Sequence, residues 1–149
     1  MIFLTNKNVI HRDLAARNIL LDNELNIKIS DFGLSRDIHA KQGYKSKNKT
    51  ALPLKWMAIE SIESGIYNTA TDVWSFGVLF WEILSKGLEP YNTIKILEIL
   101  DHIKDGNRLS QPYNCSDTIY ALLLQCWNSM PEQRPSFAYI YDFLTIIND

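Results

Sequence analysis

The sequence predicts a mainly α-helical fold, in which a helical bundle surrounds a buried central helix and a small β-hairpin lies near the N-terminus. Three observations predict it. Apolar residues recur at helical spacing after Pro53, the segment from Val73 to Leu84 is apolar on every side of a helix, and two β-prone runs flank a polar turn. With 149 residues, 46% of them hydrophobic, the chain can bury one core, so we expect one domain.

The hairpin is predicted from Ile19–Leu21 and Ile27–Ile29, which the polar turn of residues 22–26 joins. We expect little strand beyond it. From Ser35 to Thr50 there is almost no apolar periodicity, and four lysines alternate with small and polar residues. Structureless segments of this length in a compact domain are usually functional or disordered, so this segment is predicted to be a long mobile loop.

The helices are expected after Pro53. Thr69, with Asp72 three residues later, predicts a capping box, and the central helix should run from about Ala70 to just before Gly87, buried on all sides. Three further helices are predicted by apolar spacing: one over 94–103 with its end at Gly106, one over 119–127, and an amphipathic one over 137–147 that Ser136 caps.

Composition excludes several classes of function. Fifteen Lys and Arg against seventeen Asp and Glu give a net charge of -2, so the chain lacks the basic signature of a dedicated nucleic-acid binder. The lysine-rich loop could contact nucleic acid or acidic lipid, but such a loop is more often a solvated one, and we expect no nucleic-acid partner. The most apolar stretch is shorter than the ~20 residues that span a bilayer, so a soluble chain is expected.

The two cysteines, Cys115 and Cys126, belong to no C-x-x-C pair. Neither a disulfide framework nor a zinc site is therefore indicated, and a reducing, cytosolic setting fits best.

One motif carries chemistry. Residues 11–18 read H-R-D-L-x-x-x-N, and D-F-G follows at 31–33, thirteen residues after Asn18. Phosphoryl transfer needs a carboxylate that accepts the proton of the attacking hydroxyl, and hard oxygen ligands for Mg²⁺. Asp13 suits the first role, and Asn18 and Asp31 suit the second. The hairpin between them should bring its flanking residues together at one edge.

Over essentially all 149 residues the chain resembles the C-terminal lobe of a protein-tyrosine kinase domain, so residues 1–149 are expected to be a partial kinase domain. No Lys lies between Asp13 and Asn18, residues 52–58 resemble the platform beside a substrate tyrosine, and residues 75–83 resemble the family's central helix. Residues 33–38, Tyr44, 107–109 and 125–127 are most similar to receptor tyrosine kinases of the Sevenless/Ros and insulin-receptor type.

The resemblance implies ATP and Mg²⁺ as cofactors, protein tyrosines as substrates, and a place on the cytoplasmic side of a plasma-membrane receptor. It also implies roles for residues outside the two motif carboxylates. These are Arg17 near the substrate hydroxyl, Arg12 as the partner of a phosphorylated loop residue, Asp72 as support of the catalytic-loop backbone, and Glu60 paired with Arg134 in a buried ion pair. We predict that Tyr44 is the phosphorylated residue, because it is the only tyrosine between Asp31 and Glu60 and lies in the lysine-rich loop.

The chain also departs from the family. It opens with residues 1–4, which resemble the end of the helix before the catalytic loop, so the N-terminal lobe with its Gly-rich phosphate cover is expected to be absent and the isolated chain to be inactive. Ile59 replaces the usual proline before Glu60. The alternative function is a non-catalytic binding or regulatory module, but retention of Asp13, Asn18 and Asp31 favours an enzyme.

Overall fold

The computed structural model describes residues 1–37 and 52–147. Within these residues the helices are α1 (Ile2–Asn6), α2 (Ile59–Ser64), α3 (Thr69–Leu84), α4 (Ile99–Lys104), α5 (Asp117–Cys126) and α6 (Phe137–Ile146). The strands are β1 (Val9–Ile10), β2 (Ile19–Leu21), β3 (Ile27–Ile29) and β4 (Arg36–Asp37). The predicted fold class, a helical bundle with a small hairpin, is confirmed.

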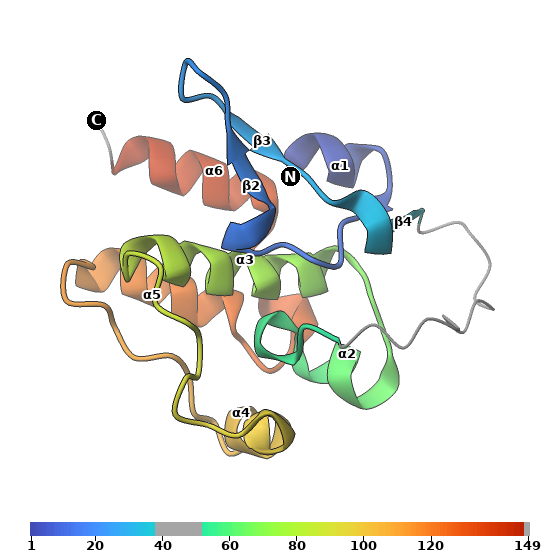
Figure 1. The fold of residues 1–149 in the computed structure, drawn as a ribbon, viewed down its shortest axis with the longest axis vertical. Helices are drawn as coiled ribbons and strands as arrows, with labels where there is room; N and C mark the ends of the chain where they lie inside the picture. The colour runs from blue at the N-terminus through green and yellow to red at the C-terminus, as the bar shows by residue number, and fades with distance from the viewer. Residues whose placement is uncertain (38–51, 148–149) are drawn as a thin grey trace.

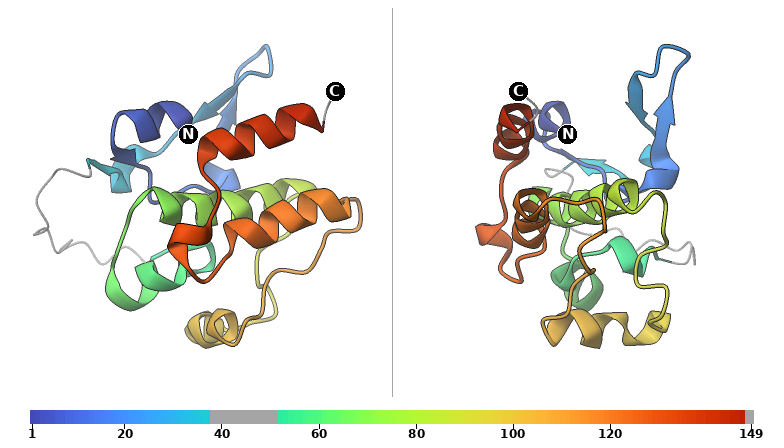
Figure 2. Two further views of the ribbon diagram at one scale, coloured as in Figure 1. Left: turned by 180° about the vertical axis from the view of Figure 1, so that it is seen from behind. Right: turned by 90° about the vertical axis from the view of Figure 1, so that its left-hand side faces the viewer.

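Helix α3 lies at the centre of the molecule (Figure 1). Helix α5 runs beside it, while α1, α6 and the β2–β3 hairpin lie on one side of α3 and α2 and α4 lie on the other (Figure 2). Most of α3 is therefore enclosed, and the segment that carries the H-R-D motif crosses over it.

The predicted hairpin forms as expected. Strands β2 and β3 are antiparallel, with Ile19 opposite Ile29. The Asp22 carboxylate closes the turn by accepting the backbone N–H groups of Asn26 at 2.8 Å and Glu24 at 3.0 Å, and the bonds from Asn26 lower the pKa of Asp22. The turn thus fixes the register of β2 and β3, which places Ile29 beside Ile19.

A second strand pair was not expected. Strand β1 pairs with β4 in antiparallel fashion, with Ile10 opposite Arg36. The predicted loop of residues 35–50 therefore contains two residues of strand, Arg36 and Asp37, and residues 38–50 lie outside the described part of the chain. This pair ties the entry of the H-R-D segment to the exit of the D-F-G segment.

The capping box of α3 lies one residue earlier than predicted. Asn68 accepts the Thr71 N–H through Oδ1 at 3.1 Å, and Thr71 Oγ1 accepts the Asn68 N–H at 3.1 Å. The expected pair of Thr69 and Asp72 is wrong, because the Asp72 carboxylate is engaged by the H-R-D backbone instead.

Two of the other predicted helices begin at residues other than those expected, and of these α5 begins two residues early, at Asp117. Helix α4 begins at Ile99, because the segment over Ile96–Glu98 forms a 3-10 turn with Leu97 exposed to solvent. Gly106 follows with φ +89, a conformation that suits glycine. Helix α6 begins after Ser136 as expected, and the Ser136 hydroxyl accepts the Tyr139 N–H at 3.1 Å.

Helices α3 and α5 pack closely through Gly77. A Cβ atom at this position would lie 2.6 Å from Nε1 of Trp127 and 2.9 Å from Cβ of Cys126. Trp127 is almost completely buried, and the neighbouring Trp74 and Leu123 are too. The absence of a side chain at Gly77 therefore sets the distance between the two helices.

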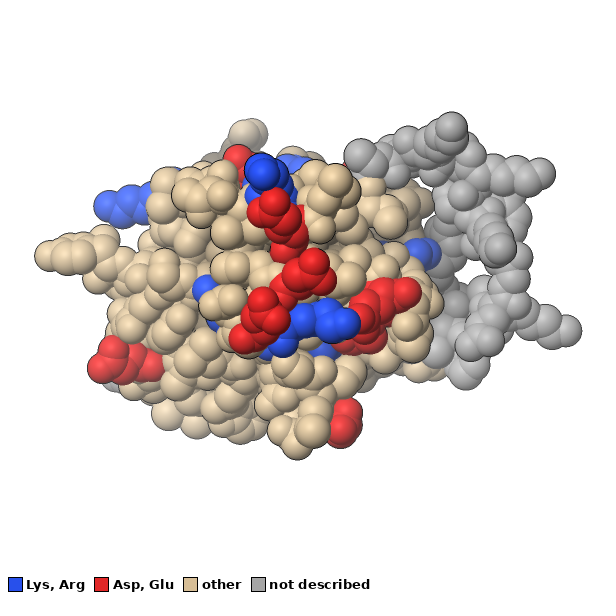
Figure 3. Space-filling model, turned by 90° about the horizontal axis from the view of Figure 1, so that it is seen from below, with Lys and Arg blue, Asp and Glu red and all other residues tan. Residues whose placement is uncertain are grey.

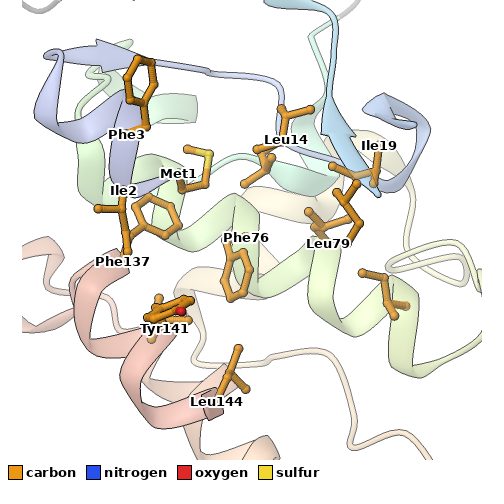
Figure 4. A pocket seen from close by; sticks show the side chains of 14 residues that line it. Met1, Ile2, Phe3, Leu14, Ile19, Phe76, Leu79, Phe137, Tyr141 and Leu144 are labelled. Atoms are coloured by element: carbon orange, nitrogen blue, oxygen red, sulfur yellow. The ribbon is translucent and has the colours of Figure 1, made fainter. Parts of the chain in front are cut away.

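One side of α3 is not buried, contrary to the expectation. Phe76 and Phe80 are half-buried and Ile83 is 57% exposed. A groove of about 410 Å³ runs over this side between α1, the hairpin and α6 (Figure 4), and its lining includes Met1, Phe3, Ile19, Phe76, Tyr141 and Leu144. The described residues provide no element that covers it.

Charge is mixed on the surface. Acidic and basic side chains lie next to one another over the middle of the face seen in Figure 3. Two ion pairs join segments that are far apart in the chain: the exposed pair of Lys104 and Glu63 at 2.5 Å, and the partly buried Lys55 with the exposed Glu89 at 2.8 Å. In the described ranges no helix has the length and apolar character to cross a membrane.

Candidate active site

The H-R-D segment is anchored to the central helix by Asp72. Its carboxylate accepts the backbone N–H groups of His11 at 2.7 Å and Arg12 at 2.9 Å. Asp72 is only 2% exposed, and burial raises its pKa while the two N–H donors oppose that rise. The donors compensate a charge buried in helix α3, and they hold Arg12 in a left-handed conformation with φ +71.

His11 connects the two motifs, a role that the sequence did not reveal. The ring is completely buried. Its Nδ1 faces the Asp13 N–H at 3.3 Å and therefore accepts, so Nε2 carries the proton and donates to the Ser30 carbonyl at 3.1 Å. The ring edge also meets Phe32, with centroids 4.9 Å apart. The sequence gives no signal of such a bridge, because Ser30 lies 19 residues further along the chain.

The cluster of Asp13, Arg17 and Asn18 lies at the end of this segment. The Asn18 side-chain amide donates to the carbonyl of Asp13 at 2.7 Å and to its carboxylate at 3.0 Å. The Arg17 guanidinium pairs with the other carboxylate oxygen. Asp13 is thus an oriented carboxylate, and both N–H bonds of Asn18 are used to orient it.

Asp31 reaches the same edge through the hairpin. Ser30 donates its backbone N–H to the Asn18 carbonyl at 2.8 Å and its hydroxyl to the same oxygen at 3.0 Å. Asp31, the next residue, has φ +60 and accepts the Gly33 N–H through Oδ1 at 3.2 Å. Asn18 and Asp31 are therefore brought together, as the spacing predicts.

The oxygen atoms of these two residues suit Mg²⁺. With its N–H bonds directed to Asp13, Asn18 keeps its amide oxygen free of hydrogen bonds within the described residues, and so does Oδ2 of the exposed Asp31. Mg²⁺ is commonly held by one or two protein oxygens together with substrate phosphates. The donor set therefore fits the metal that the motif implies.

Arg17 rests on Trp56. The guanidinium carbon lies 4.5 Å from the ring centroid, and the Trp56 indole N–H donates to Oε2 of Glu82 at 2.9 Å. The same oxygen accepts the Ala16 N–H at 2.9 Å. Sequence reasoning missed Glu82, although the one charged residue in an apolar segment was a signal that it has a buried partner.

Arg12 lies over another ring. Its guanidinium carbon is 3.7 Å from the ring centroid of Tyr67, and Nη1 donates to the Leu34 carbonyl at 3.3 Å. Its Nε is buried without a hydrogen-bond partner in the described residues. Tyr44, the predicted partner of Arg12 once phosphorylated, lies outside those residues.

Glu60 and Arg134 form a bidentate ion pair, with N–O distances of 2.6 and 2.9 Å. The Arg134 side chain is fully buried and also donates to the carbonyls of Ala70 and Asn128. The pair joins α2 to the segment before α6, and none of its hydrogen bonds involves Asp13, so we interpret it as part of the scaffold.

Three features together define a class of protein: an H-R-D loop whose backbone is bonded to the buried Asp72, a D-F-G turn, and a hairpin between the two. Residues 1–144 match the family described as protein tyrosine and serine/threonine kinase, and the chain belongs to this family. The fold subtype predicted from the sequence, a kinase C-terminal lobe, agrees with that match.

Two curated relatives are similar over 144 residues, or 97% of the chain. They are the "Myoblast growth factor receptor egl-15" of Caenorhabditis elegans, 47% identical, and the "Fibroblast growth factor receptor" of Hydra vulgaris, 45% identical. The chain spans 14% and 18% of their respective lengths. These names give no support to the finer expectation of a Sevenless or insulin-receptor type.

Proposed function

We propose that the chain carries the catalytic loop of an ATP-dependent protein-tyrosine kinase of the growth-factor-receptor type. The observation that carries the proposal is the oriented Asp13 carboxylate, held by Asn18 and Arg17, next to the hairpin edge that presents Asp31. Positioning and charge stabilisation provide nearly all of the catalysis in phosphoryl transfer, and this cluster supplies both.

Each residue has a distinct role in the proposal. Asp13 accepts the proton of the substrate hydroxyl, and Arg17 keeps the carboxylate in place and lies near that hydroxyl. Asn18 and Asp31 would hold Mg²⁺ through their oxygen atoms. The metal would supply neutralisation of the charge on the phosphates of ATP.

Tyrosine is the proposed acceptor. No Lys lies between Asp13 and Asn18, and residues 52–58 resemble the tyrosine platform. Within that platform Trp56 is fixed to α3, because its indole bonds Glu82 and its carbonyl accepts the Ser75 hydroxyl at 2.8 Å. Both relatives are named as growth factor receptors, which supports the proposal that this chain is part of a plasma-membrane receptor and lies on the cytoplasmic side.

Regulation is proposed to involve Arg12 and Tyr44. The buried Nε–H of the Arg12 guanidinium has no hydrogen-bond partner in the described residues, and a phosphate accepts guanidinium donors strongly. Tyr44 is the only tyrosine between Asp31 and Glu60. If Tyr44 is the activating site, a Tyr44→Phe variant of an active kinase that carries this chain should show no rise in rate after incubation with Mg²⁺-ATP. A rate rise equal to that of the parent would contradict the role.

The 149 residues by themselves are proposed to bind Mg²⁺-ATP weakly and to show no appreciable turnover. The sequence contains no G-x-G pair that could cover the phosphates, so part of the positioning that this reaction needs is not provided. Robust phosphorylation of tyrosine by the purified chain would contradict this part of the proposal.

A chimera tests the proposed function. In it this chain replaces the matching segment of the Hydra fibroblast growth factor receptor, and the unmodified receptor is assayed beside it. We expect Mg²⁺-ATP-dependent tyrosine phosphorylation by the chimera and its loss in the Asp13→Asn chimera. A folded chimera without activity, beside an active receptor, would favour the alternative of a non-catalytic docking module, for which the apolar groove over α3 is the supporting feature.

A further inference from the structure

Glu82 is a buried carboxylate with no counter-ion. It is 8% exposed, and it takes part in no ion pair within residues 1–37 and 52–147. A buried charge of this kind must be compensated by hydrogen-bond donors. Two N–H groups do so at the same oxygen, Oε2, and both are 2.9 Å away: the backbone N–H of Ala16 and the indole N–H of Trp56.

These two donors flank Arg17. Ala16 immediately precedes it in the chain, and the Trp56 ring lies under its guanidinium at 4.5 Å. The backbone that leads into Arg17 and the ring on which its side chain rests are therefore both attached to one oxygen of Glu82. Arg17 in turn pairs with the Asp13 carboxylate.

Arg17 needs such support, because its side chain is 42% exposed and a long exposed side chain samples many rotamers. A cation is attracted to the face of an indole ring. The hydrogen bond from the indole N–H to the Glu82 carboxylate adds electron density to the ring and so strengthens that attraction. Glu82 thus acts on Arg17 twice, through the backbone and through the ring.

We propose that Glu82 is a positioning residue, which sets the orientation of Arg17 and through it that of the Asp13 carboxylate toward the substrate hydroxyl. The inference rests on the proposed kinase function for its consequence. Glu82 itself lies beneath the site, on α3, and does not touch the substrate.

Two substitutions separate the effect of the Glu82 side-chain oxygen as a hydrogen-bond acceptor from the effect of the negative charge of Glu82. Glu82→Leu removes the shared oxygen, whereas Glu82→Gln keeps an oxygen at the same place. In the chimera with the Hydra receptor, we expect Glu82→Leu to lower kcat/KM for a tyrosine peptide by about tenfold or more, with the KM for ATP changed by less than about twofold. Glu82→Gln should retain activity within about threefold of the parent. Equal losses in the two variants would contradict the proposal.

A double-mutant cycle distinguishes positioning from general stability. In an Arg17→Ala background the side chain that Glu82 orients is gone, so Glu82→Leu should add less than about a twofold further loss. A residue that only stabilises the fold would lower the rate by the same factor in both backgrounds. That result would overturn the proposed role.

Nuclear magnetic resonance of the 149-residue chain gives a readout that needs no kinase activity. The Trp56 indole N–H resonance, assigned by its loss in Trp56→Phe, should move upfield in Glu82→Leu and little in Glu82→Gln. The Arg17 Nε–H resonance, assigned by its loss in Arg17→Ala, should also move in Glu82→Leu, because the guanidinium is then no longer held over the Trp56 ring. Unmoved Arg17 and Trp56 resonances would overturn the inference, whereas shifted resonances beside an inactive chimera would place the failure in the proposed kinase function.

Discussion

The side-chain amide of Asn18 donates both of its N–H bonds to Asp13, one to the carbonyl at 2.7 Å and one to the carboxylate at 3.0 Å. The amide is thereby oriented, and its oxygen is left for another ligand. The residue that orients the proposed base is therefore also a proposed metal ligand.

The first prediction concerns these two carboxylates in the chimera with the Hydra receptor. Asp13→Asn removes the proton acceptor and should lower kcat by about 10²-fold or more, while the affinity for Mg²⁺-ATP stays nearly the same. Asp31→Ala removes a metal ligand and should weaken Mg²⁺-dependent nucleotide binding as well. Titration calorimetry measures the affinities, and an equal loss of affinity in both variants would contradict the assigned roles.

The second prediction concerns the ion pair of Glu60 and Arg134. Because the Arg134 side chain is fully buried, Glu60→Ala leaves an uncompensated charge and should lower the free energy of unfolding by about 3–5 kcal/mol. Glu63→Ala is the matched control on the same helix, since its partner Lys104 is exposed, and it should change little. Urea denaturation of the 149-residue chain measures both. Similar losses of unfolding free energy in the two variants would contradict the prediction, because they would show that burial does not decide how much an ion pair contributes to stability.

The third prediction concerns the contact of α3 with α5. The methyl group that Gly77→Ala adds would lie 2.6 Å from Nε1 of Trp127, and overpacking of this kind costs about 1–3 kcal/mol. Because alanine gains ~1 kcal/mol over glycine in a helix, we expect a net destabilisation of up to about 2 kcal/mol. Adding Trp127→Phe removes that nitrogen, so Gly77→Ala should cost less in the Trp127→Phe background. A gain in stability from Gly77→Ala alone would contradict the close approach.

The fourth prediction concerns pH. Burial raises the pKa of the Cys126 thiol from its ordinary value of 9.0 to about 12. In the unfolded chain the thiol ionises above about pH 9, while in the folded chain it stays protonated. The stability it contributes is therefore complete below pH 9 and is lost as the pH rises toward 12.

Cys126→Ala should consequently flatten the alkaline fall in unfolding free energy, by up to about 1.4 kcal/mol for each pH unit between the two values. Burial raises the pKa of Tyr91 as well, but that contribution is common to both proteins and cancels. Urea denaturation between pH 8 and pH 11 provides the comparison. Parallel curves for Cys126→Ala and the parent would contradict the burial of an un-ionised thiol.

Local signals in the sequence were sufficient for much of the fold. Ile19–Leu21, Ile27–Ile29 and the polar turn define a hairpin by local strand and turn preferences, and the serine at 136 caps α6 as its residue type predicts. The cap of α3 was misplaced because Asn68 and Thr69 are both good caps, and only the long-range bonds of Asp72 to the H-R-D backbone decide between them.

The candidate site divides in the same way. Asp13, Asn18 and Asp31 lie in motifs and could be predicted from their spacing. The contacts of His11 and Glu82 could not be predicted, because they join segments 19 and 66 residues apart in the chain. The exposure of one side of α3 was not predicted, for a related reason. The sequence shows that Phe76 and Ile83 are apolar, but it does not show whether another element covers them.

The most direct test of the central claim is a competition between two peptides that differ only in a tyrosine or a serine at the acceptor position. The chimera is incubated with both peptides and with ATP labelled on the γ-phosphate, and the label on each peptide is measured. We predict that the tyrosine peptide carries nearly all of the label and that Asp13→Asn abolishes it. Label on the serine peptide in excess, or labelling that survives Asp13→Asn, would contradict the assignment of this site to tyrosine phosphorylation.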